Sequence, residues 1–139
     1  MSMETRIRDS FARQGMMTTL GARLTKIAPG QACVEAELTP GLSQQQGFAH
    51  GALAFAIGDS AAGYAALSLL DADSEVVTSE MGIHYIAPGR GDRLVARGTV
   101  LKPGKRLLVV QADVLAVDAT GETLVARLTG TMIRVPATG

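Results

Sequence analysis

The stretch GFAHGALAFAIGDSAAGYAAL at residues 47–67 constrains the fold most, because it is apolar or small on nearly every side. Helical spacing surrounds its one carboxylate, Asp59, with Phe55, Ala56, Ala62 and Gly63. A helix on a protein surface carries a polar face, which this segment lacks. We therefore predict a helix over residues 51–70, about 30 Å long, that other elements enclose over most of its circumference.

A short helix and two strands are predicted before the long helix. Ile7 and Phe11 are four residues apart, which indicates an amphipathic helix over residues 3–13. Residues 20–27 alternate weakly and residues 32–38 alternate clearly, with the turn signal APGQ between them. This pattern predicts a hairpin.

The chain after the helix has a strand pattern throughout. It breaks at Pro88, at KPGK and at DATGE, and short breaks that contain glycine are typical of hairpins. We predict four strands in a meander, and so an α+β fold in which one curved, six-stranded antiparallel sheet wraps a long central helix. The free edges of such a sheet invite pairing, so a second copy of the chain is expected to cover them.

The size and charge of the chain exclude several classes of protein. With 139 residues, it suits one domain over residues 1–139, of which 1–19 form an N-terminal helix and lead-in. Thirteen basic and thirteen acidic side chains balance, and only three Phe and two Tyr are present, so we expect no nucleic-acid partner.

Other patterns argue against secretion, a metal centre and a membrane span. The N-terminus has mixed charge and no apolar core like that of a signal peptide, and no Cys/His cluster has metal-ligand spacing. Asp59 within the long apolar run would cost about 2.5–3.5 kcal/mol at the bilayer centre. Cys33 is alone and shares a strand face with Glu35 and Glu37, so we interpret it as structural, in a cytoplasmic protein.

Two groups on the long helix favour chemistry. Gly51 begins the helix, where a backbone N–H has no intrahelical acceptor and the helix dipole is positive, as an oxyanion donor requires. Asp59 follows eight residues later, about 80° past two full turns and roughly 12 Å along the axis. The two could border one crevice, or in a symmetric dimer the helix start of one subunit could face the acid of its partner.

Each of these residues also has a structural interpretation. Asp59 could be a hydrogen-bonded helix acid, although apolar neighbours would desolvate it and raise its pKa. His50 could simply cap the helix, and His84 is interpreted as a structural strand residue. The segment KPGKR at residues 102–106 is a solvated hairpin tip whose charge could also meet phosphates.

Together these residues resemble the acyl-CoA thioesterases of the hotdog-fold superfamily, in the phenylacetate-degradation thioesterase group. In that group a loop ending in His-Gly-Gly opens the central helix, and an Asp follows eight residues after the first Gly. The segment FAHGALAFAIGDSAAGYAAL gives His50, Gly51 and Asp59 at that spacing. The later strands, with the break at Pro88, resemble the group as well, so the likeness covers residues 21–135.

The resemblance implies roles for individual residues. Asp59 is the expected general base or nucleophile, and the backbone N–H of Gly51 is the expected oxyanion donor. His50 is expected to shape the turn, and Thr78 to help hold the attacking water. Phe48, Ala52, Phe55, Lys105 and Arg106 are the residues expected to bind substrate, with Tyr64 as a further wall of the acyl pocket.

Two positions depart from the group. Ala52 replaces the second glycine and could narrow the acyl pocket. Many members have Asn six residues before the His, whereas this chain has Gln44, whose longer amide could do the same work from another distance.

The sequence thus predicts hydrolysis of an acyl-CoA thioester at a subunit interface of a homodimer, paired again into a homotetramer. No separate cofactor is expected, since CoA is part of the substrate. Two alternatives stay open. The chain could be a non-catalytic acyl-CoA binding module, or a hydratase or dehydratase that uses His50 with Asp59, although the dehydratases' own motifs are missing.

Overall fold

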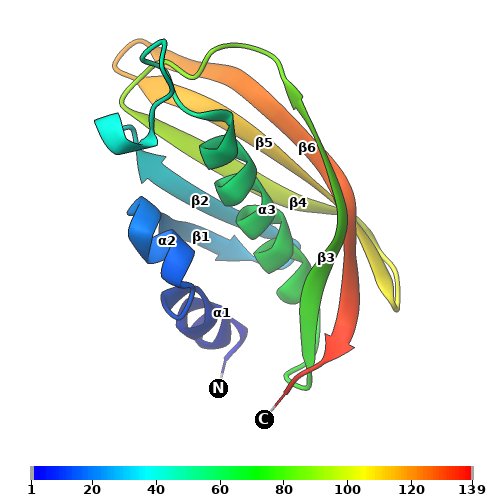
Figure 1. The fold of residues 1–139 in the computed structure, drawn as a ribbon. Helices are drawn as coiled ribbons and strands as arrows, with labels where there is room; N and C mark the ends of the chain where they lie inside the picture. Colours follow the sequence, from blue (N-terminus) through cyan, green and yellow to red (C-terminus); the bar gives the residue numbers. More distant parts are fainter. Residues whose placement is uncertain (1, 139) are drawn as a thin grey trace.

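The computed structural model describes residues 2–138. Its helices and strands follow one another in the order α1 (Met3–Ala12), α2 (Gly15–Leu20), β1 (Arg23–Ala28), β2 (Gln31–Glu37), the short 3-10 turn Pro40–Leu42, α3 (Gly51–Leu67), β3 (Ser74–Tyr85), β4 (Arg93–Pro103), β5 (Leu107–Asp118) and β6 (Gly121–Pro136). Figure 1 shows one curved sheet wrapped around α3, with α1 and α2 beside β1. The predicted α+β hotdog architecture is confirmed.

The order of the strands corrects one prediction. The sheet is antiparallel with the order β1-β2-β4-β5-β6-β3. Strands β4, β5 and β6 form a meander as predicted, but β3 does not lie next to β4. Instead β3 pairs with β6 and forms a free edge. Residues 86–92 carry the chain back to β4 across the end of the sheet, where the N–H groups of Ile86 and Asp92 donate to carbonyls of β6 and β5. A tight hairpin cannot join β3 to β4, because β5 and β6 lie between them in the sheet.

The hairpin β1–β2 has the predicted turn. Pro29 and Gly30 connect the paired residues Ala28 and Gln31, and Gly30 has a φ of 75°. Pro at the second position and a left-handed Gly at the third define a type II turn. The segment before β1 differs from the prediction, because residues 15–20 form α2 and Gly21, with a φ of 67°, ends that helix.

Helix α3 is shorter at its C-terminus than predicted, ending at Leu67 instead of residue 70. The hydroxyl of Ser68 donates to the Ala65 carbonyl and accepts from the Gly30 N–H at 2.8 Å, which fixes the chain as it leaves the helix. The guanidinium of Arg6 donates to the carbonyls of Leu67 at 3.1 Å and Leu70 at 3.3 Å, so α1 supplies the positive charge that a helix C-terminus favours.

Small residues let α3 approach the concave face of the sheet closely. A Cβ atom at Gly98 on β4 would overlap the backbone of Ala61, and one at Gly58 on α3 would lie 2.8 Å from the Leu128 side chain. The core between them is made of buried Ala, Val, Leu and Ile side chains, among which Ile57 and Leu128 are fully buried. Within residues 2–138 no helix is long and apolar enough to cross a membrane.

We predict that Gly98→Ala lowers the free energy of unfolding by about 1–3 kcal/mol, because the added methyl must push α3 away from the sheet. Gly82→Ala on edge strand β3 is the matched control, since its nearest atom outside the chain neighbours is the Thr129 oxygen at 3.8 Å and its cost should stay within about 0.5 kcal/mol. Urea unfolding of both variants measures the difference. Equal losses would show that close packing at Gly98 does not hold the helix.

Candidate active site

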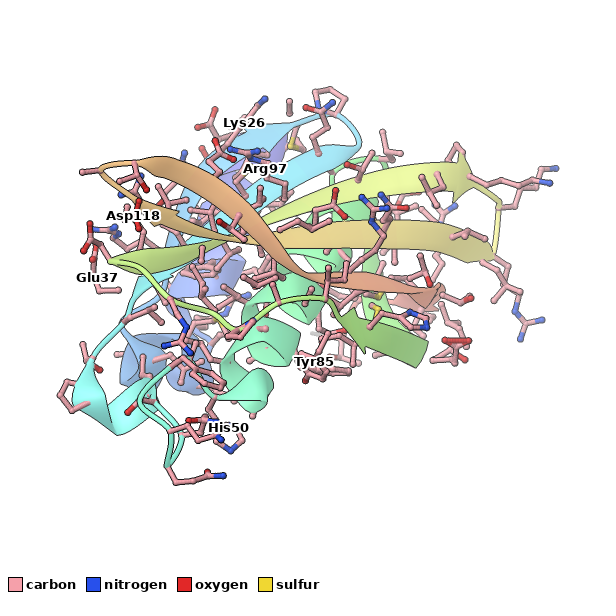
Figure 2. All side chains as sticks on the ribbon, turned by 90° about the horizontal axis from the view of Figure 1, so that it is seen from above. Lys26, Glu37, His50, Tyr85, Arg97 and Asp118 are labelled. Carbon is pink, nitrogen blue, oxygen red and sulfur yellow. The ribbon has the colours of Figure 1, made fainter. Side chains whose placement is uncertain are left out.

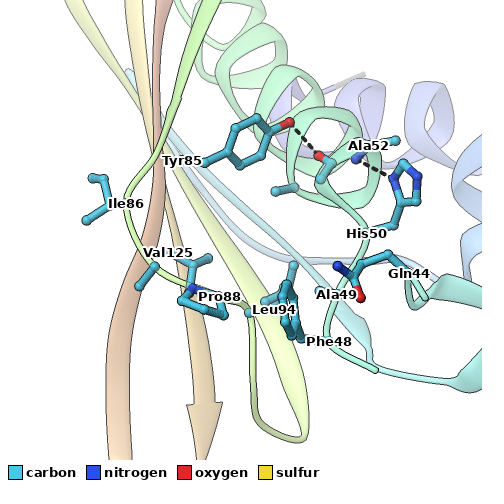
Figure 3. A pocket seen from close by; sticks show the side chains of 14 residues that line it. Gln44, Phe48, Ala49, His50, Ala52, Tyr85, Ile86, Pro88, Leu94 and Val125 are labelled. Atoms are coloured by element: carbon cyan, nitrogen blue, oxygen red, sulfur yellow. Dashed lines mark hydrogen bonds between the residues drawn. The ribbon is translucent and has the colours of Figure 1, made fainter. Parts of the chain in front are cut away.

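A pocket of about 540 Å³ opens at the start of α3. It lies between the loop that enters the helix and the end of β3, as Figure 3 shows. Its walls are mostly apolar, and they include Phe48, Ala54, Ile86, Leu94 and Val125. Among the lining residues Gln44, His50 and Tyr85 carry the polar side-chain atoms, and none of the lining side chains is an acid or a Lys or Arg.

The first turn of α3 places Gly51 and Ala52 on the wall of this pocket. His50 is the N-cap in an extended conformation, and its Nδ1 accepts from the Ala52 N–H at 2.9 Å. The predicted capping role of His50 therefore has a defined hydrogen bond. The Gly51 N–H has no acceptor among the hydrogen bonds of residues 2–138, and so it can bind a ligand oxygen.

Gln44 also lines the pocket, but its amide is bound within its own turn. Its Nε2 donates to Gln46 Oε1 at 3.1 Å, and its Oε1 accepts from the Gln46 N–H. These contacts are local and exposed. Each bond uses one of the two donors or one of the two acceptor sites of the amide, so a second N–H stays available to a substrate.

Asp59 lines a second, smaller pocket of about 170 Å³ farther along α3. Its Oδ1 accepts from the Thr78 hydroxyl at 2.8 Å, which joins the helix to edge strand β3. Asp59 is half-buried, less enclosed than its apolar neighbours in the sequence suggested. Tyr64 lines this pocket and not the larger one, and its hydroxyl accepts from Gln14 Nε2 at 3.0 Å, so the N-terminal helices support it.

The two candidate groups thus lie in different pockets of the same chain. Between them runs a stripe along α3 that the sheet does not bury, with residues spaced three or four apart: Ala52, Phe55, Ala56, Asp59, Ser60 and Gly63. The predicted wrapping of α3 is therefore incomplete in one chain. The stripe faces away from the sheet's concave surface, next to edge strand β3, which carries exposed Val77 and Tyr85.

The predicted substrate-binding residues also lie in different places and do not form one cluster in the single chain. Phe48 and Ala52 line the larger pocket, and Phe55 lies on the uncovered stripe, packed partly against the core. Lys105 and Arg106 occupy the β4–β5 turn and line neither pocket. Arg134 of β6 bonds to the carbonyls of both, which places the turn at the end of the sheet that carries Thr78.

Sequence reasoning did not single out Tyr85 and Arg90. The Tyr85 hydroxyl donates to the Gly51 carbonyl at 2.9 Å, and the Arg90 guanidinium lies 4.9 Å from the centre of the Phe48 ring. The alternation along β3 could have identified Tyr85. Met81 and Ile83 face the helix, and Tyr85 is the next residue on the same face of the strand. Figure 2 shows His50 and Tyr85 on the helix side of the sheet, with Lys26 and Arg97 on the other side.

Cys33 and His84 lie outside the two pockets and have no contact with the rest of the described chain that indicates a catalytic role. Burial raises the pKa of the Cys33 thiol, which disfavours the nucleophilic thiolate and agrees with its interpretation as a structural residue. His84 is exposed on the outer face of β3, opposite Arg127. No group of three or more His, Cys, Asp or Glu residues in the described part of the chain could hold a metal ion.

Comparison with known proteins assigns the family. The family model of the thioesterase superfamily matches residues 46–133, which is more than half of the chain and includes His50, Gly51, Asp59 and Thr78. A thioesterase family protein from Silicibacter pomeroyi has a crystal structure with a TM-score of 0.95 and 36% identity, covering 98% of this chain and 100% of that one.

Two more distant structures share the fold. The PaaI protein of E. coli, from the phenylacetic acid degradation operon, has a TM-score of 0.86 and 24% identity, covering 98% of this chain and 95% of that one. A thioesterase from Haemophilus influenzae has a TM-score of 0.82 and 17% identity, covering 93% of this chain and 88% of that one. The match of the family model and the 36% identity over nearly the whole chain support hydrolysis of a thioester, and the chain belongs to the thioesterase superfamily.

Proposed function

We propose that the chain hydrolyses acyl-CoA thioesters at a site that two subunits build together. In this site the Gly51 N–H of one subunit binds the thioester carbonyl oxygen, and Asp59 of the facing subunit acts on the carbonyl carbon. The observation that carries the proposal is the separation of Gly51 and Asp59 into two pockets on the same side of α3.

Several features support a composite site. The oxyanion donor lies in a pocket whose lining includes no carboxylate, and the acid lies in a pocket too small for a long acyl group. Both open beside a helix stripe and an edge strand that the single chain leaves uncovered. In a two-fold dimer the same patch meets itself, so the start of one α3 can face the middle of the other. A second pairing of such dimers would give the predicted homotetramer.

The groups of this site can carry out hydrolysis without a separate cofactor. The Gly51 N–H, with the positive end of the α3 dipole behind it, stabilises the negative charge that develops on the carbonyl oxygen. Asp59 takes a proton from water, whose oxygen bonds to the carbonyl carbon. The carbon–sulfur bond then breaks, and Asp59 returns the proton to the departing CoA sulfur.

A second course uses Asp59 as the nucleophile. Its oxygen then bonds to the carbonyl carbon, and CoA leaves as a thiolate that takes a proton from solvent. Water opens the resulting anhydride and releases the acid. In both courses the hydrogen bond from Thr78 fixes the Asp59 carboxylate, and the same hydroxyl lies where it can hold the water.

The larger pocket suits the acyl group. Its apolar walls and the absence of charged side chains among its lining residues favour an uncharged acyl chain or ring over one that ends in a carboxylate. Phe48 and Ala52 form part of the wall, and Phe55 lies where a facing subunit would meet the chain. Gln44, which also lines this pocket, can position the thioester with the N–H that its bonds to Gln46 do not use.

Two sets of cations can meet the CoA phosphates. Lys105 and Arg106 lie on the side of Asp59, so they would act from the subunit that supplies the acid. Arg90 lies on the side of Gly51, in a neighbouring surface pocket that shares Ala49 and Gly89 with the acyl pocket. No carboxylate in residues 2–138 forms an ion pair with Arg90, which leaves its guanidinium open to phosphate.

The structure weakens one alternative more than the other. A hydratase would use His50 for proton transfer, but His50 Nδ1 already accepts from the Ala52 N–H as the helix cap, which leaves only Nε2 for that chemistry. A non-catalytic acyl-CoA binder fits the engaged amide of Gln44. Hydrolysis by the purified protein separates this alternative from the proposed enzyme.

We predict that Asp59→Asn lowers kcat for thiol release from acyl-CoA by about 10²–10⁴-fold, because it removes the base or nucleophile. Affinity for S-hexyl-CoA, a thioether that cannot be hydrolysed, should change by less than about threefold, since Asn keeps the volume of Asp. Asp73→Asn, an exposed acid in the loop after α3, is the matched control. A chain that binds acyl-CoA but releases no thiol, or an Asp59→Asn variant with full activity, would contradict the proposal.

We predict that Arg90→Ala raises KM for an acyl-CoA by about tenfold, because a charge-assisted contact to phosphate is lost. KM for the same acyl group on N-acetylcysteamine, which has no phosphate, should not change. Exposed Arg13→Ala is the matched control, and the pair Lys105→Ala and Arg106→Ala tests the other set of cations. An equal rise for both thioesters would mean that Arg90 acts on the acyl pocket through Phe48 and not on phosphate.

A further inference from the structure

One peptide unit at the start of α3 is held by side chains at both of its ends. This unit joins Gly51 to Ala52. Its N–H, which belongs to Ala52, donates to His50 Nδ1 at 2.9 Å, and its carbonyl, which belongs to Gly51, accepts from the Tyr85 hydroxyl at 2.9 Å. Figure 3 shows both bonds on opposite sides of the helix start.

This arrangement selects which amide of the first turn can bind a ligand. The Ala52 N–H is used by His50, and the Leu53 N–H donates to the His50 carbonyl at 3.0 Å. The Gly51 N–H belongs to the preceding peptide unit and stays available. Because the held peptide follows directly on the Gly51 Cα, fixing its plane limits the rotation that would turn the Gly51 N–H away from the pocket.

Tyr85 and Gly51 also fit one another sterically. A Cβ atom at position 51 would lie 2.9 Å from the Tyr85 hydroxyl oxygen and 3.0 Å from the ring carbon that bears it. The glycine therefore makes room for the phenol as well as for a substrate. Tyr85 is 58% exposed, and the hydrogen bond to Gly51 is what anchors the polar end of its side chain.

A bulge in β3 lets one strand hold both reacting groups. Thr78 bonds to Asp59 and Tyr85 bonds to Gly51, so both side chains face the helix. They are seven residues apart, and strict alternation would put them on opposite faces of the sheet. The pairing of β3 with β6 shifts register between Thr78 and Glu80, and the extra residue, Ser79, restores the common face. Bulges of this kind re-aim side chains next to active sites.

We propose that Tyr85 is a positioning residue for thioester hydrolysis. Its hydroxyl, together with His50, clamps the Gly51–Ala52 peptide and so aims the Gly51 N–H at the carbonyl oxygen of the substrate. This inference rests on the proposed function. Removal of an oxyanion donor typically costs about 10²–10³ in kcat, and loss of its alignment costs part of that.

The test is Tyr85→Phe, which removes the hydroxyl and keeps the ring. We expect kcat for acyl-CoA to fall about tenfold, with KM and the affinity for S-hexyl-CoA changed by less than twofold. The thioether has no thioester carbonyl oxygen, so its binding does not depend on the aim of the Gly51 N–H. His84→Ala, the preceding residue on the outer face of β3, is the matched control and should keep wild-type kcat.

A double-variant cycle tests whether Tyr85 and His50 act on the same peptide or affect activity independently. If Tyr85 and His50 hold the same peptide, Tyr85→Phe with His50→Ala should lose less activity than the product of the two single losses. Two results would overturn the clamp. One is a kcat for Tyr85→Phe within twofold of wild type, and the other is a loss of activity in the double variant that equals the product of the two single losses. If that happens while Asp59→Asn still abolishes activity, the proposed function survives without it. A wild-type chain with no hydrolysis would overturn both.

Discussion

The close approach of α3 to the concave face of the sheet sets the positions of all the groups in the site. Gly98 and Gly58 leave no room for a side chain between helix and sheet, and fully buried Ala61 and Ala62 continue that contact. A close-packed interior allows little independent movement. The side of α3 that faces the sheet is therefore fixed, and the opposite stripe with Asp59 stays uncovered in the single chain.

Edge strand β3 connects this packing to the chemistry. Because it pairs with β6 on one side only, its other edge is free, and its inward side chains reach the uncovered part of α3. Thr78 meets the acid near the middle of the helix, and Tyr85 meets the helix start. A free edge is normally a liability. Under the proposed function, this edge is where a second copy completes the site and joins the two pockets that one chain presents separately.

The sequence predicts the elements better than their arrangement. The apolar run before and after Asp59 and the period-two alternation of the strands are local signals, and they locate α3 and the β1–β2 hairpin. The place of β3 beside β6 depends on pairing between distant segments, which a local pattern does not contain. The short helix α2 depends on the left-handed conformation of Gly21, and the weak alternation around Leu20 conceals it.

For the candidate site too, the sequence predicts individual residues better than the contacts between them. His50, Gly51 and Asp59 form a motif of fixed spacing, so a resemblance could identify them, and Thr78 follows from the same resemblance. Tyr85 has a signal in the strand alternation, but its contact with Gly51 depends on the bulge at Ser79, which shifts the face of the strand. The stacking of Arg90 on Phe48 joins two loops, and no local pattern predicts such a contact.

The central claim is that Gly51 and Asp59 of different subunits form one site, and mixing two inactive variants tests it most directly. Gly51→Pro removes the N–H at a position whose backbone suits proline, since His50 before it is already extended. Its ring also displaces the Tyr85 hydroxyl, which is acceptable in a variant that must be inactive by itself. Asp59→Asn removes the acid. If the site is shared, random dimers of the two variants contain some sites with both groups intact, and activity should return to about one quarter of wild type. Mixtures that stay as inactive as each variant alone, despite exchanging subunits, would contradict the account.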